Sequence, residues 1–178
     1  MRITTITQTN IAMKRLVFRV LILALFTALF AACSSIDCKL NGTVLCHYAI
    51  QTTDGDDAAL LYPLSVTLNR KIVAGDTVYI NQKSDITSFD LPMSYNGDVD
   101  EITLTMHLDS ITTISDVVKI TKTNEPYLES VDCAARYNHT IKQVTHTNNF
   151  INEIIINNPK VNNDASNTNI LIRIDDSY

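Results

Sequence analysis

Apolar and polar residues alternate along several short segments of this chain, and this pattern constrains the fold more than any other feature. Every second residue is apolar in Leu64-Ser65-Val66-Thr67-Leu68, and the same period of two runs from Ile102 to Leu108. Successive side chains of a β-strand point to opposite faces of a sheet. Each segment is therefore predicted to form a strand with one buried face.

Further strands are predicted where β-branched and aromatic residues cluster. They span Val44–Gln51, Thr77–Asn81, Ile86–Leu91, Ile114–Thr121, Tyr137–Thr147, Phe150–Asn157 and Asn169–Ile174. Turn-forming residues separate them, among them Asp54-Gly55-Asp56-Asp57, Asn96-Gly97-Asp98, Asn124-Glu125-Pro126 and Asn148-Asn149. Strands about ten residues apart, without a long helical pattern, predict an all-β fold, an antiparallel β-sandwich of the Ig-like kind. Asn148-Asn149 predicts a hairpin of its two flanking strands, because Asn tolerates a positive φ.

The N-terminal segment has the features of a secretory signal peptide. Lys14, Arg15 and Arg19 precede the apolar, uncharged run Val20–Ala32. That run has 13 residues, whereas a helix needs about 20 to cross a bilayer. We therefore predict that residues 1–32 are a cleaved signal peptide and that translation starts at Met13.

The end of this run, Leu29-Phe30-Ala31-Ala32-Cys33, resembles a bacterial lipobox. In that motif a cysteine receives a diacylglycerol thioether and becomes the new N-terminus; Phe30 replaces the usual Leu. The resemblance implies lipidation of Cys33. The composition of the rest of the chain predicts a linker at 33–41 and one domain at 42–178. An ordinary cleavage site with a free Cys33 is the alternative. Acyl chains contribute about 0.8 kcal/mol per buried CH₂, so the protein would be anchored to a membrane without spanning it.

The charge balance excludes one class of partner. The full chain has a net charge of −5, from 14 basic and 19 acidic residues. Removal of residues 1–32 deletes Arg2, Lys14, Arg15 and Arg19, so 10 basic and 19 acidic residues remain, a net charge of −9. We expect no nucleic-acid partner, because binding to phosphates requires an excess of Lys and Arg.

An exported chain can form disulfides. With Cys33 lipidated, three cysteines remain, and they allow three single pairings. Cys38 and Cys133 each follow an aliphatic residue and an Asp, whereas Cys46 lies in an apolar run. We favour a Cys38–Cys133 disulfide with Cys46 unpaired in the core, while the other pairings stay open. No C-x-x-C spacing points to a metal.

Signatures of catalytic and cofactor sites are missing from the sequence, including G-x-S-x-G, the P-loop, H-E-x-x-H and G-x-G-x-x-G. We therefore expect no enzyme, cofactor or metal site. The histidines are scattered at His47, His107, His139 and His146. The last two are seven residues apart, which predicts opposite faces of one strand. The Asp-rich turns at Gly55 and Gly97 lack the ligand pattern of an EF-hand and are predicted to be solvated turns.

Five parts of the chain carry a family resemblance as a set. They are Ser34–Cys38, Leu91–Tyr95, Glu129–Cys133, His139 and Ile155–Asn162. The set resembles an uncharacterised family of Bacteroidetes lipoproteins that is defined by a domain of unknown function. This resemblance covers nearly all of the mature chain, implies a lipid-anchored place in the outer membrane, and brings no activity. Asp76-Thr77-Val78 and Asp109-Ser110-Ile111 also resemble the Bacteroidetes O-glycosylation motif, which implies modification of Thr77 and Ser110.

These observations favour a non-enzymatic binding or scaffolding module in the outer membrane. Surface-exported lipoproteins of this phylum usually carry an acidic run after the lipidated cysteine. Here Ser34-Ser35-Ile36-Asp37 offers one acid, which favours the periplasmic face. The partner, a protein or a glycan, is unknown. The alternative is a surface glycan-binding accessory protein with exposed aromatic rings, for which the candidates are Tyr62, Tyr79, Tyr95 and Tyr127.

Overall fold

The computed structural model describes residues 18–19, 44–69, 75–128, 130, 133, 135–162, 166–175 and 177–178. The chain divides into two compact units, Met1–Asp37 and Cys38–Tyr178. In the first unit the described residues are Phe18 and Arg19, and both are helical. No helix among the described residues has the length and apolar character needed to cross a bilayer. Cys33 and Cys38 lie outside the described residues, so their lipidation and disulfide stay predictions.

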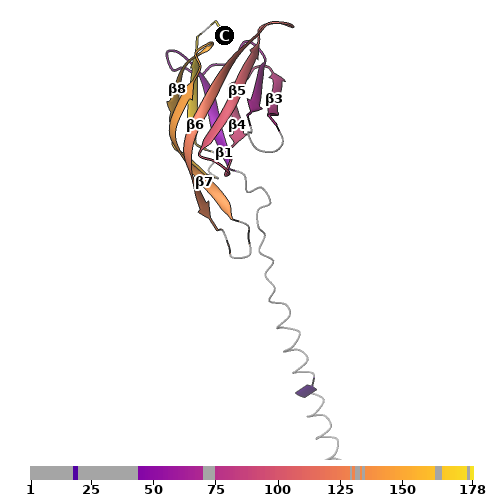
Figure 1. Ribbon diagram of the computed structural model, residues 1–178, viewed down its shortest axis with the longest axis vertical. Helices are drawn as coiled ribbons and strands as arrows, with labels where there is room; N and C mark the ends of the chain where they lie inside the picture. Colours follow the sequence, from indigo (N-terminus) through magenta and orange to yellow (C-terminus); the bar gives the residue numbers. More distant parts are fainter. Residues whose placement is uncertain are drawn as a thin grey trace, which may run out of the picture. The chain divides into compact units, whose positions relative to one another are not determined.

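Ten strands form two sheets in the described part of the second unit (Figure 1). The four-stranded sheet contains, in spatial order, β4 (Ser88–Pro92), β1 (Leu45–Thr52), β10 (Ile170–Ile174) and β8 (Ile151–Ile156). The six-stranded sheet contains β3 (Thr77–Lys83), β2 (Leu64–Leu68), β5 (Val99–His107), β6 (Thr113–Tyr127), β7 (Arg136–His146) and β9 (Lys160–Val161). The pairing of β1 with β10 is parallel, and the other pairings are antiparallel. The predicted all-β sandwich is confirmed.

The core lies between the sheets and follows the alternation in the sequence. β2 and β5 are adjacent strands that point their apolar positions inward, namely Leu64, Val66, Leu68, Ile102, Leu104 and Met106. The opposite layer contributes further buried side chains, among them Cys46, Tyr48, Ile50, Leu91, Ile170 and Ile172. Full burial of one such aliphatic side chain stabilises the fold by about 1.5–3 kcal/mol.

Each of the nine predicted strands is present, with ends shifted by a few residues, whereas the short β9 was not predicted. The largest difference is at β6, which continues through Asn124-Glu125-Pro126, where the sequence predicted a turn. Beyond Thr121, β6 pairs with β7 but no longer with β5. Pro126 therefore lies on a free strand edge, where its missing N–H breaks no ladder bond. The extended part of β6 and β7, residues 122–127 and 136–141, is called the arm below (Figure 1).

The predicted hairpin across Asn148-Asn149 is wrong. β7 pairs with β6 and β9, whereas β8 pairs with β10 in the other sheet. The carboxylate of Asp116 on β6 accepts hydrogen bonds from the backbone N–H groups of Asn149, Phe150 and Ile151 at 2.8–3.2 Å. The Asp116 carboxylate therefore supplies hydrogen-bond acceptors to the backbone N–H groups of residues 149–151. At these residues the chain passes from one sheet to the other and makes no tight turn.

The prediction that His139 and His146 lie on opposite faces is also wrong. A β-bulge at Lys142 shifts the register, because Thr121 pairs with Gln143 and the next residue of β6 pairs with Ile141. One extra residue in a strand reverses its alternation beyond that point. The two histidines therefore lie on the same face of the sheet, opposite Asn124 and Val118 of β6 respectively.

Candidate functional site

A buried polar cluster occupies one end of the sandwich, where residues 93–98 between β4 and β5 meet the inner side of the arm. Its centre is Lys122, whose side chain has 0% exposure. The alternation of β6 turns Lys122 inward behind Val118 and Ile120. The ammonium donates hydrogen bonds to the carbonyl oxygens of Ser94 (2.5 Å) and Gly97 (2.8 Å). A lysine thus fastens the connection between the sheets to the arm.

Asp100 supplies the opposite charge. One carboxylate oxygen lies 3.6 Å from the Lys122 ammonium. The same carboxylate accepts hydrogen bonds from the backbone N–H and the hydroxyl of Ser94. Burial lowers the pKa of Lys122, and the nearby carboxylate of Asp100 opposes that shift. The ion pair and the carbonyl acceptors together compensate for the removal of the ammonium from water.

Asn124 links this lysine to a buried histidine. Its side-chain oxygen accepts from Lys122 Nζ at 3.0 Å and lies 2.7 Å from Nδ1 of His139. Its amide nitrogen donates to the carbonyls of Gly97 (3.0 Å) and Tyr95 (3.4 Å). An amide oxygen only accepts hydrogen bonds, so Nδ1 of His139 carries the proton and donates. The network thereby fixes the tautomer of His139.

His139 is held neutral at pH 7. Burial lowers its pKa to about 4, the charge of Lys122 contributes in the same direction, and Asp100 opposes both. A neutral imidazole beside an ammonium costs less free energy than two cations would. The cluster therefore contains one buried cation, one carboxylate and one uncharged histidine.

An aromatic pair lies next to this cluster. The rings of Tyr95 and Tyr137 are stacked, with centroids 5.3 Å apart and planes inclined by 12°. Tyr95 belongs to residues 93–98 and remains 61% exposed. The Lys122 and Asn124 hydrogen bonds to Ser94, Tyr95 and Gly97 hold the backbone that carries this ring. The arrangement can present a rigid, exposed tyrosine at the surface.

The donors and acceptors of the cluster bind the chain itself. The described contacts of Lys122 are two backbone carbonyls, the Asn124 amide and Asp100. The hydrogen bonds to the two carbonyls and to the Asn124 oxygen use the three donors of the ammonium. The cluster therefore serves to attach residues 93–98 to the arm. Within the described residues, no group of three His, Cys, Asp or Glu side chains is placed to hold a metal ion.

The structure describes two of the four cysteines, Cys46 and Cys133. Cys46 is free and buried, as predicted, and desolvation raises its pKa to about 12. Cys133 is buried and belongs to the segment that connects β6 to β7. Its predicted partner, Cys38, lies outside the described residues, as does Cys33. Of the two predicted glycosylation sites, Thr77 at the start of β3 and Ser110 between β5 and β6 are both exposed.

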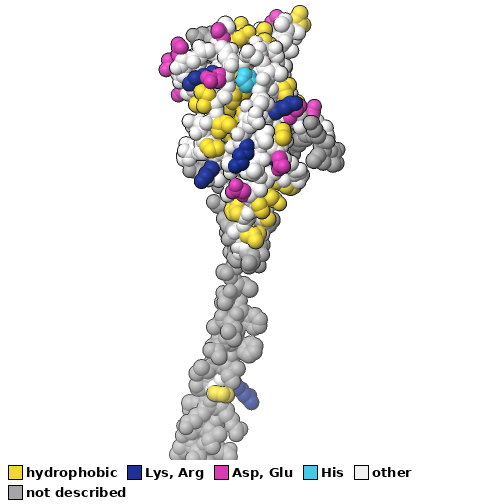
Figure 2. Space-filling model, turned by 60° about the vertical axis from the view of Figure 1, so that its left-hand side comes forward, with side chains coloured by type: hydrophobic (Ala, Val, Ile, Leu, Met, Phe, Trp, Pro, Cys, Tyr) yellow, Lys and Arg dark blue, Asp and Glu magenta, His cyan; other side chains and the backbone are white. Residues whose placement is uncertain are grey.

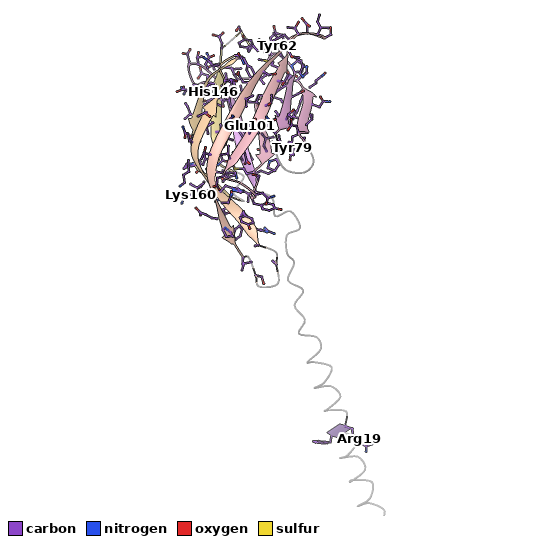
Figure 3. The ribbon with its side chains drawn as sticks, viewed as in Figure 1. Arg19, Tyr62, Tyr79, Glu101, His146 and Lys160 are labelled. Atoms are coloured by element: carbon purple, nitrogen blue, oxygen red, sulfur yellow. The ribbon has the colours of Figure 1, made fainter. Side chains whose placement is uncertain are left out.

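The tyrosines named as glycan-binding candidates do not gather on one face. Tyr62 packs partly against the core, and Tyr79 lies on the edge strand β3. Figure 3 shows these two at separate places on the sandwich. Tyr95 stacks on Tyr137, which was not among the candidates. Tyr127 ends β6 and is half-buried.

The remaining predicted polar residues have local roles. Nδ1 of His47 contacts the carboxylate of Asp90, and Nε2 of His107 lies 2.9 Å from the Ser65 hydroxyl. Nδ1 of His146 lies 2.7 Å from the Thr147 carbonyl. The turn at Gly55, which has a φ of +95°, exposes the nearby side chains of Asp54, Asp56 and Asp57. This turn is solvated, as predicted.

Lys122, Asp100 and Asn124 were not predicted as site residues. Their signal was present in the alternation Val118-x-Ile120-x-Lys122-x-Asn124, which places a lysine and an amide at core-facing positions. A buried lysine is rare without a partner. The partners come from residues 93–98, and only the fold brings that segment to the arm.

Comparisons with known proteins identify a family. A search of curated proteins and a search of solved structures each give no match. A model of a family of unknown function (DUF6452) matches residues 64–174, which include the cluster from Ser94 to His139. The match spans more than half of the chain, and the chain therefore belongs to this family.

Proposed function

We propose that this protein is a lipid-anchored lipoprotein of the outer membrane that acts as a non-enzymatic binding or scaffolding module and faces the periplasm. Lipidation of Cys33 would attach the chain to the membrane five residues before Cys38, the first residue of the compact β-unit. Two or more acyl chains hold a domain stably at a surface, since each buried CH₂ contributes about 0.8 kcal/mol.

The observation that carries the binding role is the use of the buried polar groups. Lys122 binds backbone carbonyls of residues 93–98, and Asp116 binds backbone N–H groups at the sheet crossing. Both contacts fix connections between strands. Such contacts suit a rigid scaffold that presents its loops and edges to a partner.

The anchor is tested with Cys33→Ala in the full chain. We expect the wild type to sediment with envelopes and to incorporate labelled palmitate, and the variant to do neither. Ser34→Ala is the matched control, since it changes the neighbouring residue and keeps the thiol. A Cys33→Ala protein that still sediments with the membrane and still incorporates palmitate would contradict the proposal.

The orientation and the partner need separate measurements. Protease treatment of intact cells should leave the domain uncleaved if it faces the periplasm, and release of the domain would place it on the surface. Cross-linking of the native lipoprotein in its membrane, followed by mass spectrometry, should give a discrete partner. The Cys33→Ala protein serves as the control for contacts that depend on the anchor.

The alternative, a glycan-binding accessory protein, requires several exposed aromatic rings on one face. Tyr62 and Tyr79 lie at separate places, and Tyr95 stacks on Tyr137. We therefore rank this function second.

A further inference from the structure

Three parts of the β-unit end on the same side of the sandwich. β1 begins at Leu45, opposite Pro92 at the end of β4. Residues 93–98 follow β4 and lead to Val99, the first residue of β5. The arm extends in the same direction, because β5 begins opposite Thr121 and β6 continues beyond it. The N-terminal linker therefore enters the domain at the end that carries Tyr95 and the arm.

Exposed apolar side chains are found at this end. Tyr95 is 61% exposed, Val99 55% and Leu128 64%. Figure 2 shows hydrophobic side chains gathered on the lower part of the described β-unit in that view. A large exposed apolar side chain gains free energy when it enters a lipid interface, and Tyr suits that interface because its ring is apolar and its hydroxyl is polar.

We propose that this end of the sandwich lies against the membrane, with Tyr95 and Leu128 near the tip of the arm in the lipid headgroup region. This inference rests on the proposed anchor at Cys33. We name the membrane as the partner of this surface because the chain between the anchor and the domain is short. Val44 is eleven positions after Cys33, which is at most about 40 Å of extended chain.

The predicted disulfide would shorten this tether. Cys133 lies between β6 and β7, at the tip of the arm, and Cys38 follows Cys33 by five residues. A Cys38–Cys133 bond would hold the tip of the arm within roughly 24 Å of the lipidated residue, about 18 Å for five extended residues and about 6 Å across the disulfide. The tether would then leave the opposite end of the sandwich, with Ile111 in the β5–β6 turn, directed away from the bilayer.

The charges at this end do not favour an anionic surface. Asp98 and Glu125 are exposed near the arm, and Lys160 of β9 lies beside β7. Among the described residues at this end, these mixed signs provide no basic patch, and Lys122 is buried. Contact would therefore depend on apolar and aromatic side chains, and it should occur on zwitterionic lipid and vary little with salt.

The test uses the absence of Trp from the sequence. Tyr95→Trp introduces a single indole at the proposed contact and keeps an aromatic ring on Tyr137. Ile111→Trp is the matched control, because Ile111 is 91% exposed at the opposite end. Each full-length lipoprotein is purified from membranes and reconstituted into phosphatidylcholine vesicles with or without brominated acyl chains.

We expect Trp emission from the Tyr95→Trp protein to shift to the blue and to lose most of its intensity in brominated vesicles, while the Ile111→Trp protein changes little. Flotation with the vesicles is measured on the same samples. A protein that floats but whose Tyr95→Trp emission is unquenched would overturn the membrane contact and leave the anchor intact. A protein that does not float would overturn the anchor and, with it, the contact. Unquenched emission that shifts when soluble oligosaccharide is added would also overturn the contact and would favour glycan binding by Tyr95.

Discussion

The backbone N–H of Phe150 donates a hydrogen bond of 2.8 Å to the carboxylate of Asp116, a residue 34 positions earlier in the chain. The same carboxylate accepts from the N–H groups of Asn149 and Ile151 and from the hydroxyl of Thr147. Asp116 has 0% exposure. This single side chain therefore closes the corner at which the chain passes from the six-stranded to the four-stranded sheet.

We predict that Asp116→Ala lowers the free energy of unfolding by about 3 kcal/mol or more, because buried N–H groups lose their acceptor. Asp116→Asn should also destabilise, since its amide nitrogen cannot accept these bonds. Urea unfolding of the variants and the wild type checks this. Asp54→Asn, at an exposed turn, is the control and should change stability little. An Asp116→Ala protein as stable as the wild type would show that water replaces the carboxylate at the corner.

The Asp116 contribution should depend on pH. Desolvation raises the pKa of Asp116, but the hydrogen bonds from Thr147, Phe150, Asn149 and Ile151 outweigh it, so the pKa falls below its ordinary value of 3.8. A carboxyl group with a lowered folded-state pKa stabilises fully above its unfolded pKa and loses this effect as pH falls through the folded value. The stability difference between wild type and Asp116→Asn should therefore be constant near neutral pH and shrink below about pH 4.

His139 should give the protein a second, separate pH dependence. Its pKa is lowered from 6.5 to about 4, chiefly by burial. Between these values the unfolded chain binds a proton that the folded chain does not, so stability should fall as pH falls from 6.5 to 4. His139→Gln should flatten this part of the curve, as measured by urea unfolding at several pH values. His146→Gln, on the same strand outside the cluster, is the control. An equal slope in wild type and His139→Gln would exclude His139 as its source.

Period-two alternation predicted the strands well, because a strand with one buried face leaves a local mark in the sequence. Leu64–Leu68 was predicted with the observed bounds of β2. The route between strands was harder to predict, because it depends on distant residues. Asn148-Asn149 has the composition of a hairpin turn, but the carboxylate that decides its course comes from β6.

The candidate site was predicted in part for the same reason. His139 and Tyr95 were singled out from the sequence, whereas Lys122 and Asn124, which connect them, were not. A lysine on a strand is usually an exposed residue, and its carbonyl partners at Ser94 and Gly97 are more than 20 positions away. The bulge at Lys142, which brings His139 and His146 to one face, also has no clear mark in the sequence.

Both residues predicted to carry O-glycosylation, Thr77 and Ser110, are exposed, and the modification can be tested. Ser110 is exposed in a turn that Asp109 fixes by accepting hydrogen bonds from the N–H groups of Ile111 (2.8 Å) and Thr112 (2.7 Å). We expect the intact mass of natively purified protein to exceed the polypeptide mass by hexose units. Ser110→Ala and Thr77→Ala should each remove one set of these units, whereas Thr112→Ala should remove none. A mass equal to the lipidated polypeptide alone would refute the modification.

If Cys38 and Cys133 form the predicted disulfide, the effects of substituting them on the free energy of unfolding should not be additive. It would close a loop of 95 residues, worth on the order of 4 kcal/mol in the chain-entropy model. Cys38→Ser and Cys133→Ser should each lose about this stability, and the double variant should lose no more than either, because one bond is removed in each case. Additive losses, measured by urea unfolding, would instead show that the cysteines act separately. Alkylation offers a second check: the buried Cys46 thiol, with a pKa of about 12, should react only after unfolding, and it should be the one thiol that reacts without reductant.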